Sequence, residues 1–123
     1  MDKQLLQAFR KKLETQRHDT LQSLARVQKE GRSLGQDCPS DNADRSVTTF
    51  SREFLFERST QRKHLLRNIE AALDRIHAGT FGECANCENQ ISSRRLEAMP
   101  FTAYCRECQE RLEHRQTSER RRV

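Results

Sequence analysis

Apolar residues recur at seven-residue steps along the first part of the chain, with one polar exception at the third step. The repeat consists of Leu6, Leu13, Thr20, Val27 and Leu34. A seven-residue spacing places side chains on one stripe of an α-helix. The segment from Asp2 to about Leu34 is therefore predicted to form one long amphipathic helix.

A polar segment then interrupts the pattern, and a second helical stripe follows it. Gly35 and Pro39 both disfavour helix continuation, so the chain is expected to turn here. The second helix is predicted to begin near Asp44 and to end at Gly79, which is placed as a C-terminal cap. Its apolar stripe consists of Val47, Phe50, Phe54, Leu55, Leu65, Ile69, Ala72, Leu73 and Ile76.

Two amphipathic helices of similar length joined by a short turn can cover each other's apolar stripes by packing antiparallel. At about 1.5 Å per residue, such a hairpin is roughly 45 to 50 Å long. The sequence thus predicts a two-helix coiled coil over residues 1–79, with a tip at about 35–46. The alternative is that the seven-residue stripe pairs two chains, against which the polar Gln16 and Thr20 argue.

The composition agrees with an α-helical protein that has a small core. Of 123 residues, 33% are hydrophobic and 33% are charged, and Trp is absent, so a large globular core is not expected. The sequence has no run of eighteen apolar residues and no secretory pattern, which predicts a cytoplasmic protein without membrane association. The net charge of +5 fits a nucleic acid and an acidic protein surface equally.

Four of the five cysteines form two Cys-x-x-Cys pairs, Cys84/Cys87 and Cys105/Cys108, with seventeen residues between them. This spacing is typical of four-thiolate zinc sites. Because four protein ligands leave no open coordination position, we predict one structural zinc ion rather than a catalytic one. The zinc finger is expected over residues 80–110, with a C-terminal helix and basic tail over 105–123, and Cys38 at the tip is interpreted as a bystander.

An acidic cluster lies at the predicted tip of this otherwise basic protein. Asp37, Asp41 and Asp44 fall within eight residues. In one interpretation, Asp41 or Asp44 caps the second helix by accepting backbone hydrogen bonds. In the other, the hairpin delivers these carboxylates to a cationic or metal-containing site in a large partner. The spacing alone leaves both interpretations open.

The cysteine segment, from Thr80-Phe-Gly-Glu-Cys-Ala-Asn-Cys through Arg94-Arg95-Leu96-Glu97-Ala98-Met99-Pro100 to Cys105-Arg-Glu-Cys-Gln109, closely resembles the C4 zinc finger of the DksA/TraR family of bacterial transcription factors. Asp41-Asn-Ala-Asp44-Arg45-Ser46 resembles the Asp-x-x-Asp-x-Ala motif at the coiled-coil tip of that family. Residues 4–14 resemble the start of its first coil. The resemblance extends over nearly the whole chain and favours the longer, DksA-like type.

The resemblance implies a regulator, not an enzyme, that binds RNA polymerase and inserts its hairpin tip into the secondary channel to modulate initiation, with a link to the stringent response. Asp41 and Asp44 would act near the active centre, and Arg45 and Ser46 would complete the tip motif. The protein would be monomeric and make no sequence-specific DNA contact. The alternatives are a transcript-cleavage factor like the Gre proteins and a zinc-ribbon nucleic-acid binder, which the basic C-terminal end would favour.

This chain departs from the family pattern in three respects. Ser46 replaces the usual Ala and adds a hydroxyl that could cap the helix, and Glu88 replaces the usual Gly, at a cost if its φ is positive. The positions aligned with basic residues that help bind guanosine tetraphosphate are Asn68, Met99 and Gln109. Since a tetraphosphate depends on Lys and Arg, we expect weak or absent dependence on this alarmone.

Overall fold

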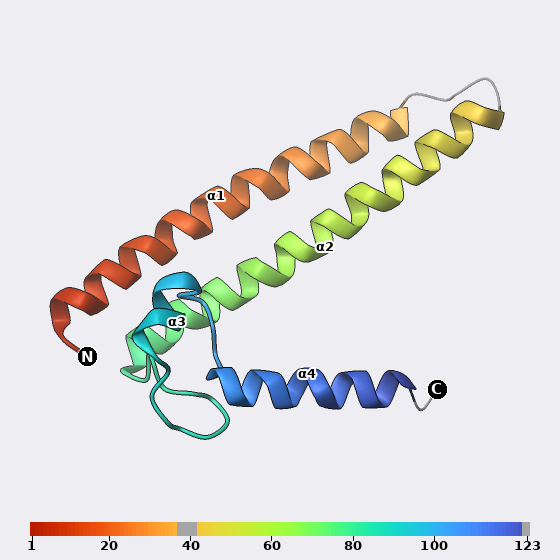
Figure 1. Ribbon diagram of the computed structural model, residues 1–123. Helices are drawn as coiled ribbons and strands as arrows, with labels where there is room; N and C mark the ends of the chain where they lie inside the picture. The colour runs from red at the N-terminus through yellow and green to blue at the C-terminus, as the bar shows by residue number, and fades with distance from the viewer. Residues whose placement is uncertain (37–41, 122–123) are drawn as a thin grey trace. The chain divides into compact units, whose positions relative to one another are not determined.

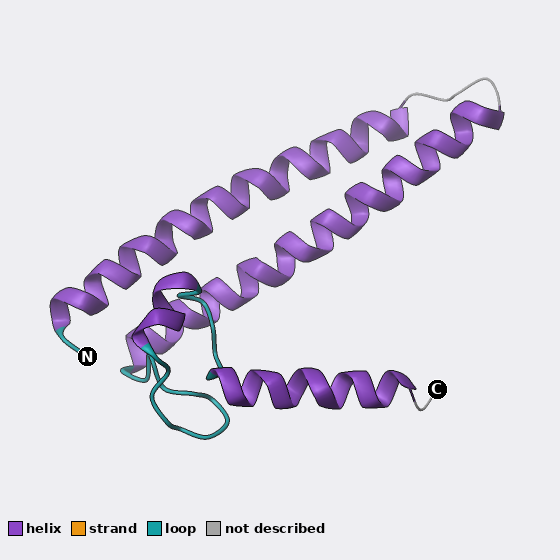
Figure 2. Cartoon of the chain, viewed as in Figure 1, coloured by secondary structure: helices purple, strands orange, loops and turns teal. Residues whose placement is uncertain are grey.

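The computed structural model describes residues 1–36 and 42–121, and helices dominate this part of the chain (Figure 1). The helices are α1 (Lys3–Gln36), α2 (Asn42–Ala78), α3 (Ser93–Ala98) and α4 (Arg106–Arg121). The other described residues form loops and turns (Figure 2). Among them, Glu83 and Gln90 form one isolated antiparallel bridge. The predicted fold class, an all-α protein with a long helix pair, a small C4 zinc finger and a C-terminal helix, is confirmed.

The ends of the two long helices differ slightly from the prediction. α1 continues through Gly35 to Gln36, and α2 begins at Asn42, two residues before Asp44. At the other end of α2, Gly79 has a φ of +78°. Its N–H donates to the carbonyl of Ile76 at 3.2 Å, and the N–H of Thr80 donates to the carbonyl of Arg75 at 3.0 Å. These paired bonds form a Schellman motif, which confirms Gly79 as the cap.

The chain divides into two compact units. One contains Thr15–Arg67, and the other combines Met1–Glu14 with Asn68–Val123. Each long helix therefore contributes to both units. The predicted division into residues 1–79, 80–110 and 105–123 stays a prediction.

Within the unit of residues 15–67, α1 and α2 lie side by side and antiparallel (Figure 1). Val27 of α1 and Leu55 of α2 are buried. Thr20 is also buried, and its hydroxyl donates to the carbonyl of Gln16 at 2.7 Å, which satisfies the polar group inside the helix pair. Thr20 and Val27 of the seven-residue stripe are thus covered within one chain, which favours the hairpin over the pairing of two chains.

Three phenylalanines of α2 lie outside this seam. Phe50 and Phe54, which the sequence placed in the apolar stripe, are 72% and 52% exposed, and Phe56 is 76% exposed. At about 100° per residue, Phe50 lies about 140° around the helix from the buried Leu55. The prediction that Phe50 and Phe54 belong to the covered stripe was therefore wrong, because the seam follows Leu55 instead.

The second unit has a core to which three segments contribute. Phe9 and Leu13 come from α1, Ile69 and Ala72 come from the end of α2, and the finger segment adds Phe81, Ile91, Leu96 and Pro100. The rings of Phe9 and Phe81 contact each other with centroids 5.4 Å apart. Lys12 donates to the carbonyl of Glu97 at 2.7 Å. The finger therefore packs on the helix ends rather than around a core of its own.

Candidate metal centre

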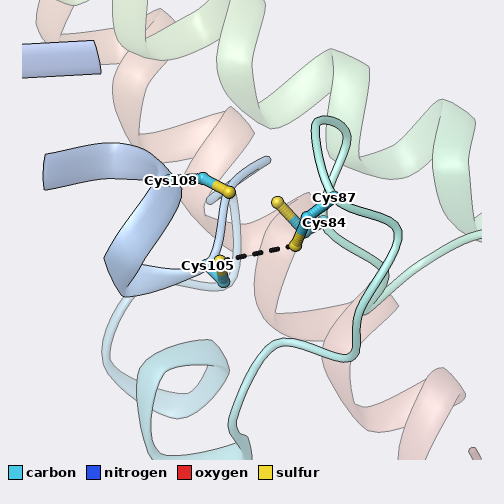
Figure 3. A group of neighbouring side chains, drawn as sticks. All are labelled: Cys84, Cys87, Cys105 and Cys108. Atoms are coloured by element: carbon cyan, nitrogen blue, oxygen red, sulfur yellow. Dashed lines mark hydrogen bonds between the residues drawn. The ribbon is translucent and has the colours of Figure 1, made fainter. Parts of the chain in front are cut away.

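The four cysteines predicted as zinc ligands come together in the unit that contains the finger (Figure 3). Cys84 and Cys87 lie on the loop after α2, Cys105 immediately precedes α4, and Cys108 lies in the first turn of α4. Their sulfur atoms all lie within 4.8 Å of one another, and the Sγ atoms of Cys87 and Cys105 are 3.7 Å apart. The structure thus places two distant pairs around one point.

This geometry fits a tetrahedral zinc ion. Zn–S bonds of about 2.3 Å in a tetrahedron separate the sulfurs by about 3.8 Å, close to the distance between Cys87 and Cys105. Cys84 and Cys108 are only 2% exposed, whereas Cys87 is exposed. Four thiolate ligands fill the coordination sphere and leave no position for a reactive water. The site therefore binds one structural zinc ion.

Backbone hydrogen bonds shape the loop of residues 84–89, which we call the zinc knuckle. The N–H of Cys84 donates to the carbonyl of Asn89 at 2.8 Å, and the N–H of Glu88 donates to the carbonyl of Cys84 at 3.0 Å. Ala85 donates to the carbonyl of Ala103 at 2.8 Å, which ties the knuckle to the segment before Cys105. Glu88 has a φ of +63°, so the residue that replaces the family's usual Gly does adopt a backbone conformation that favours glycine.

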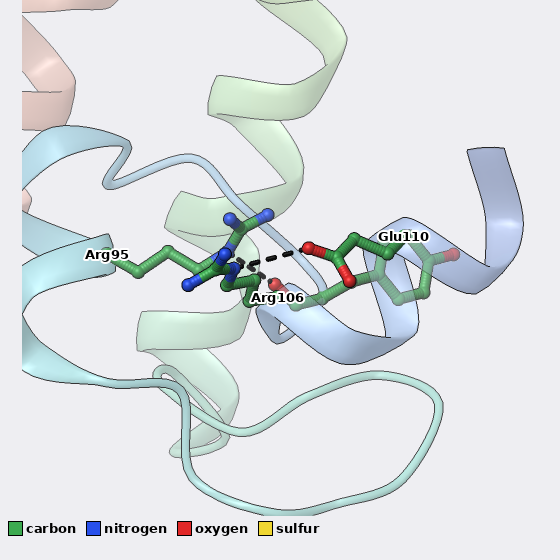
Figure 4. A network of polar contacts seen from close by, with 4 residues as sticks. Arg95, Arg106 and Glu110 are labelled. Atoms are coloured by element: carbon green, nitrogen blue, oxygen red, sulfur yellow. Dashed lines mark hydrogen bonds and ion pairs between the residues drawn. The ribbon is translucent and has the colours of Figure 1, made fainter. Parts of the chain in front are cut away.

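The second cysteine pair is positioned by α3 and α4. The Ser92 hydroxyl accepts a hydrogen bond from the N–H of Arg95 and caps α3. The guanidinium of Arg95 donates to the carbonyl of Tyr104 at 3.0 Å, directly before Cys105, and Arg106 pairs with Glu110 at 3.2 Å along α4 (Figure 4). The start of α4 also presents the positive end of its helix dipole to the sulfur cluster.

The surroundings of the sulfurs give them different proton affinities. Burial raises the pKa of Cys84, but backbone hydrogen bonds from Cys87, Cys105 and Asn86 outweigh it and bring that pKa to about 6. The Asn86 amide, which donates to Cys108 at 3.4 Å, lowers the pKa of Cys108, but the neighbouring sulfurs and burial raise it to about 12. Without a metal, one cysteine of the cluster is thus readily deprotonated, and its negative charge disfavours deprotonation of its neighbours. A bound divalent cation would neutralise the charge of several thiolates.

The predicted tip residues belong to the other unit. Asp41 and Cys38 lie outside the described residues. Asp44, Arg45 and Ser46 lie in α2 within five residues of its start at Asn42. The capping role that the sequence left open to Asp44 and Ser46 stays a prediction. The roles of these four tip residues, Asp41, Asp44, Arg45 and Ser46, stay predictions.

Sequence reasoning missed the exposed aromatic surface of α2, near its tip end. The hydrophobic pattern identified Phe50 and Phe54 but assigned them to the seam. Leu55 and Ile69 are both buried and lie two seven-residue steps apart, so they mark the stripe of α2 that is covered. Phe50 and Phe54 do not fall on this series, and that was the signal available in the sequence. In the described residues, no helix is long and apolar enough to span a bilayer.

Comparison with known proteins gives three findings. Residues 79–114 match the model of the prokaryotic dksA/traR C4-type zinc finger. An uncharacterized protein of Aquifex aeolicus is 33% identical over 115 residues, which are 92% of this chain and 79% of that protein. The RNA polymerase-binding transcription factor DksA of Salmonella typhimurium is 32% identical over 116 residues, 93% of this chain and 70% of that protein.

A solved structure extends the similarity to the fold. The transcription factor DksA2 of Pseudomonas aeruginosa superimposes with a TM-score of 0.81 and 31% sequence identity. The match covers 94% of this chain and 88% of that one. The similarity thus includes the long helices as well as the finger.

Proposed function

Because the chain belongs to the DksA/TraR family of C4-type zinc-finger proteins, we propose that it is a transcription regulator that binds RNA polymerase and inserts its hairpin tip into the secondary channel to modulate initiation. The observation that supports this most strongly is the similarity over nearly the whole chain to a protein named as an RNA polymerase-binding transcription factor. A match to the finger alone would leave the long helices without an assigned role.

In this proposal, the activity resides at the tip and not at the zinc. The closed four-thiolate site contributes no reactive ligand, so the protein acts as a regulator and not as an enzyme. α2 begins at Asn42, so most of the family-like acidic motif would lie in the first turns of α2. Asp41 and Asp44 would act on cationic groups or metal ions near the polymerase active centre, and Arg45 and Ser46 would shape the tip.

The zinc finger serves as a scaffold for the base of the hairpin. Zinc fixes the start of α4 against the zinc knuckle, and the segment before the knuckle packs on α1 through the contact of Phe81 with Phe9. Arg75 of α2 donates to the carbonyl of Thr102 at 3.2 Å, which adds a polar link between α2 and the finger. We further propose that the protein acts as a monomer in the cytoplasm, without sequence-specific DNA binding.

Dependence on guanosine tetraphosphate is proposed to be weak. Met99 is exposed, Asn68 is half-buried, and the Gln109 amide donates to Glu113 at 3.1 Å. None of the three supplies the positive charge that a tetraphosphate requires.

The test compares the variant Asp44→Asn with the control Asp37→Asn, which removes a nearby charge outside the motif. Both are assayed for binding to core RNA polymerase and for their effect on an initiation-sensitive promoter. Asp44→Asn is expected to abolish the transcriptional effect and to leave binding intact, while Asp37→Asn retains both. Loss of binding in Asp44→Asn, or full transcriptional activity, would refute the assignment of the tip. If the wild-type protein stimulates RNA polymerase to cleave backtracked RNA, a Gre-like factor is established instead.

A further inference from the structure

A groove with aromatic walls lies between α1 and α2 in the unit of residues 15–67. α1 contributes Lys29 and Glu30, and α2 contributes Phe50, Phe54, Leu55 and Arg58. The groove has a volume of about 580 Å³. We call it the aromatic groove. Its size is within the range of concave sites that bind ligands or partner side chains.

The exposure of the two phenylalanines requires an explanation. Phe50 and Phe54 are separated by four residues, so they lie about 40° apart on one face of α2. Both are more than half exposed in a chain of which only 33% is hydrophobic. Burial of apolar surface stabilises a folded protein or a complex by about 25 cal/mol per Å², and exposed aromatic rings do not contribute this free energy. Clustered exposed aromatics of this kind mark interaction surfaces.

The charges of the groove indicate what it binds. Lys29 and Arg58 contribute positive charges from the two helices, and Glu30 contributes the one negative charge among the lining residues. The Arg58 guanidinium lies 5.7 Å from the centroid of the Phe54 ring, so charge and apolar surface are adjacent. An apolar segment flanked by acidic residues complements this arrangement. The net charge of +5 on each chain disfavours a second copy of the chain as the occupant.

The position of the groove on α2 connects it to the proposed function. Phe50 and Phe54 follow Asp44 by six and ten residues on the same helix. At 1.5 Å per residue, they lie about 9 and 15 Å from it along the helix axis. If the tip enters the polymerase channel, the aromatic groove enters the channel or its mouth with it.

We propose that the aromatic groove binds an amphipathic helix of RNA polymerase, with apolar side chains against Phe50 and Phe54 and acidic side chains facing Lys29 and Arg58. This inference rests on the proposed function, because it takes the polymerase as the partner. Binding of a helix in an apolar groove would account for two aromatic residues on an exposed face. The tip acids then supply the regulatory effect, while the aromatic groove supplies affinity.

The first experiment compares the double variant Phe50→Ser/Phe54→Ser with the control Phe56→Ser. Phe56 is 76% exposed and lies about 200° around α2 from Phe54, so the control removes an aromatic residue from another face. Circular dichroism verifies that both variants keep their helix content. The double variant is expected to bind core RNA polymerase at least about tenfold more weakly, whereas Phe56→Ser stays within about twofold of the wild type.

The second experiment tests the charge of the partner segment. Arg58→Glu is expected to weaken binding to core polymerase and to flatten its dependence on salt, because attraction to acidic groups is screened by ions. Arg58→Lys retains the charge and should bind more tightly than Arg58→Glu. Equal affinities of Arg58→Glu and the wild type would overturn the assignment of acidic residues to the partner.

The outcomes separate this inference from the proposed function. If the wild-type protein fails to bind core polymerase, the proposed function fails, and this inference fails with it. If the wild type binds and Phe50→Ser/Phe54→Ser binds equally well, only the groove assignment is refuted. If sedimentation shows a wild-type dimer that the double variant converts to monomer, a second copy occupies the groove, and the proposal is overturned.

Discussion

Replacing Glu88 with glycine is expected to stabilise the zinc knuckle. Among the described residues, Glu88 is the one non-glycine residue with a positive φ, at +63°. A left-handed conformation costs a residue with a Cβ about 1–2 kcal/mol. Glycine removes this strain but loses about 0.5–1 kcal/mol through its greater freedom in the unfolded chain. The net gain in the free energy of unfolding is therefore about 0–1.5 kcal/mol.

The substitution preserves the other interactions of the knuckle. The Glu88 N–H donates to the carbonyl of Cys84, and glycine keeps that donor. The Glu88 side chain is exposed, so its removal opens no cavity. Urea unfolding of the zinc-loaded protein, followed by circular dichroism at a fixed excess of zinc, measures the change, because bound metal itself contributes to stability.

Two controls separate backbone strain from loss of the carboxylate. Glu88→Ala removes the charge but keeps the Cβ, so its stability should stay within about 0.5 kcal/mol of the wild type. Glu83→Gly introduces glycine in the same loop at a residue without a positive φ and should destabilise by about 0.5–1 kcal/mol. If Glu88→Ala stabilises as much as Glu88→Gly, or if Glu88→Gly destabilises, strain at this position is not the cause.

Other changes test the base of the hairpin, the metal and the alarmone. Phe9→Ala removes the ring that contacts Phe81 and should cost about 3–5 kcal/mol in urea unfolding, and a loss below about 1 kcal/mol would contradict the shared core. Arg75→Met leaves the carbonyl of Thr102 without this donor and should cost about 1–3 kcal/mol, with Arg75→Lys closer to the wild type in the same assay. Zinc affinity, measured by competition with a chromogenic chelator, should fall as pH is lowered from 8 to 6 because protons compete for the thiolates, and constant affinity would exclude a thiolate site. Guanosine tetraphosphate should leave the transcriptional effect nearly unchanged, and a strong enhancement would show that other basic residues bind it.

Local signals in the sequence predicted much of the fold and the metal centre. The seven-residue stripe identified α1, Gly79 identified the end of α2, and the cysteine spacing identified the zinc ligands. Each of these features depends on residues close together in the chain or on a spacing specific to one chemistry. The departure from glycine at Glu88 also indicated the knuckle position where the backbone is strained.

Features that depend on distant segments were not predicted. The contact between Phe9 and Phe81 joins residues far apart in the sequence, so no local pattern reveals the core that the finger shares with α1 and α2. The exposure of Phe50 and Phe54 depends on which face of α2 meets α1, and apolar character alone does not specify that face. The functional roles of Asp41 and Asp44 depend on a partner and stay predictions.

The segments that make up each of the two units set the order in which the units can fold during synthesis. Residues 15–67 are continuous, so this unit can form once they have left the ribosome. Residues 1–14 can pack into their unit only after the residues from Asn68 onward have been synthesised. The zinc site is complete only after Cys108 has been synthesised. At 5–20 residues per second, the forty or so residues from Arg67 to Cys108 take about 2–8 s to translate. In a shortage of zinc, the helix pair can therefore form while the unit that holds the four cysteines lacks its metal link, which leaves that unit more open to proteolysis.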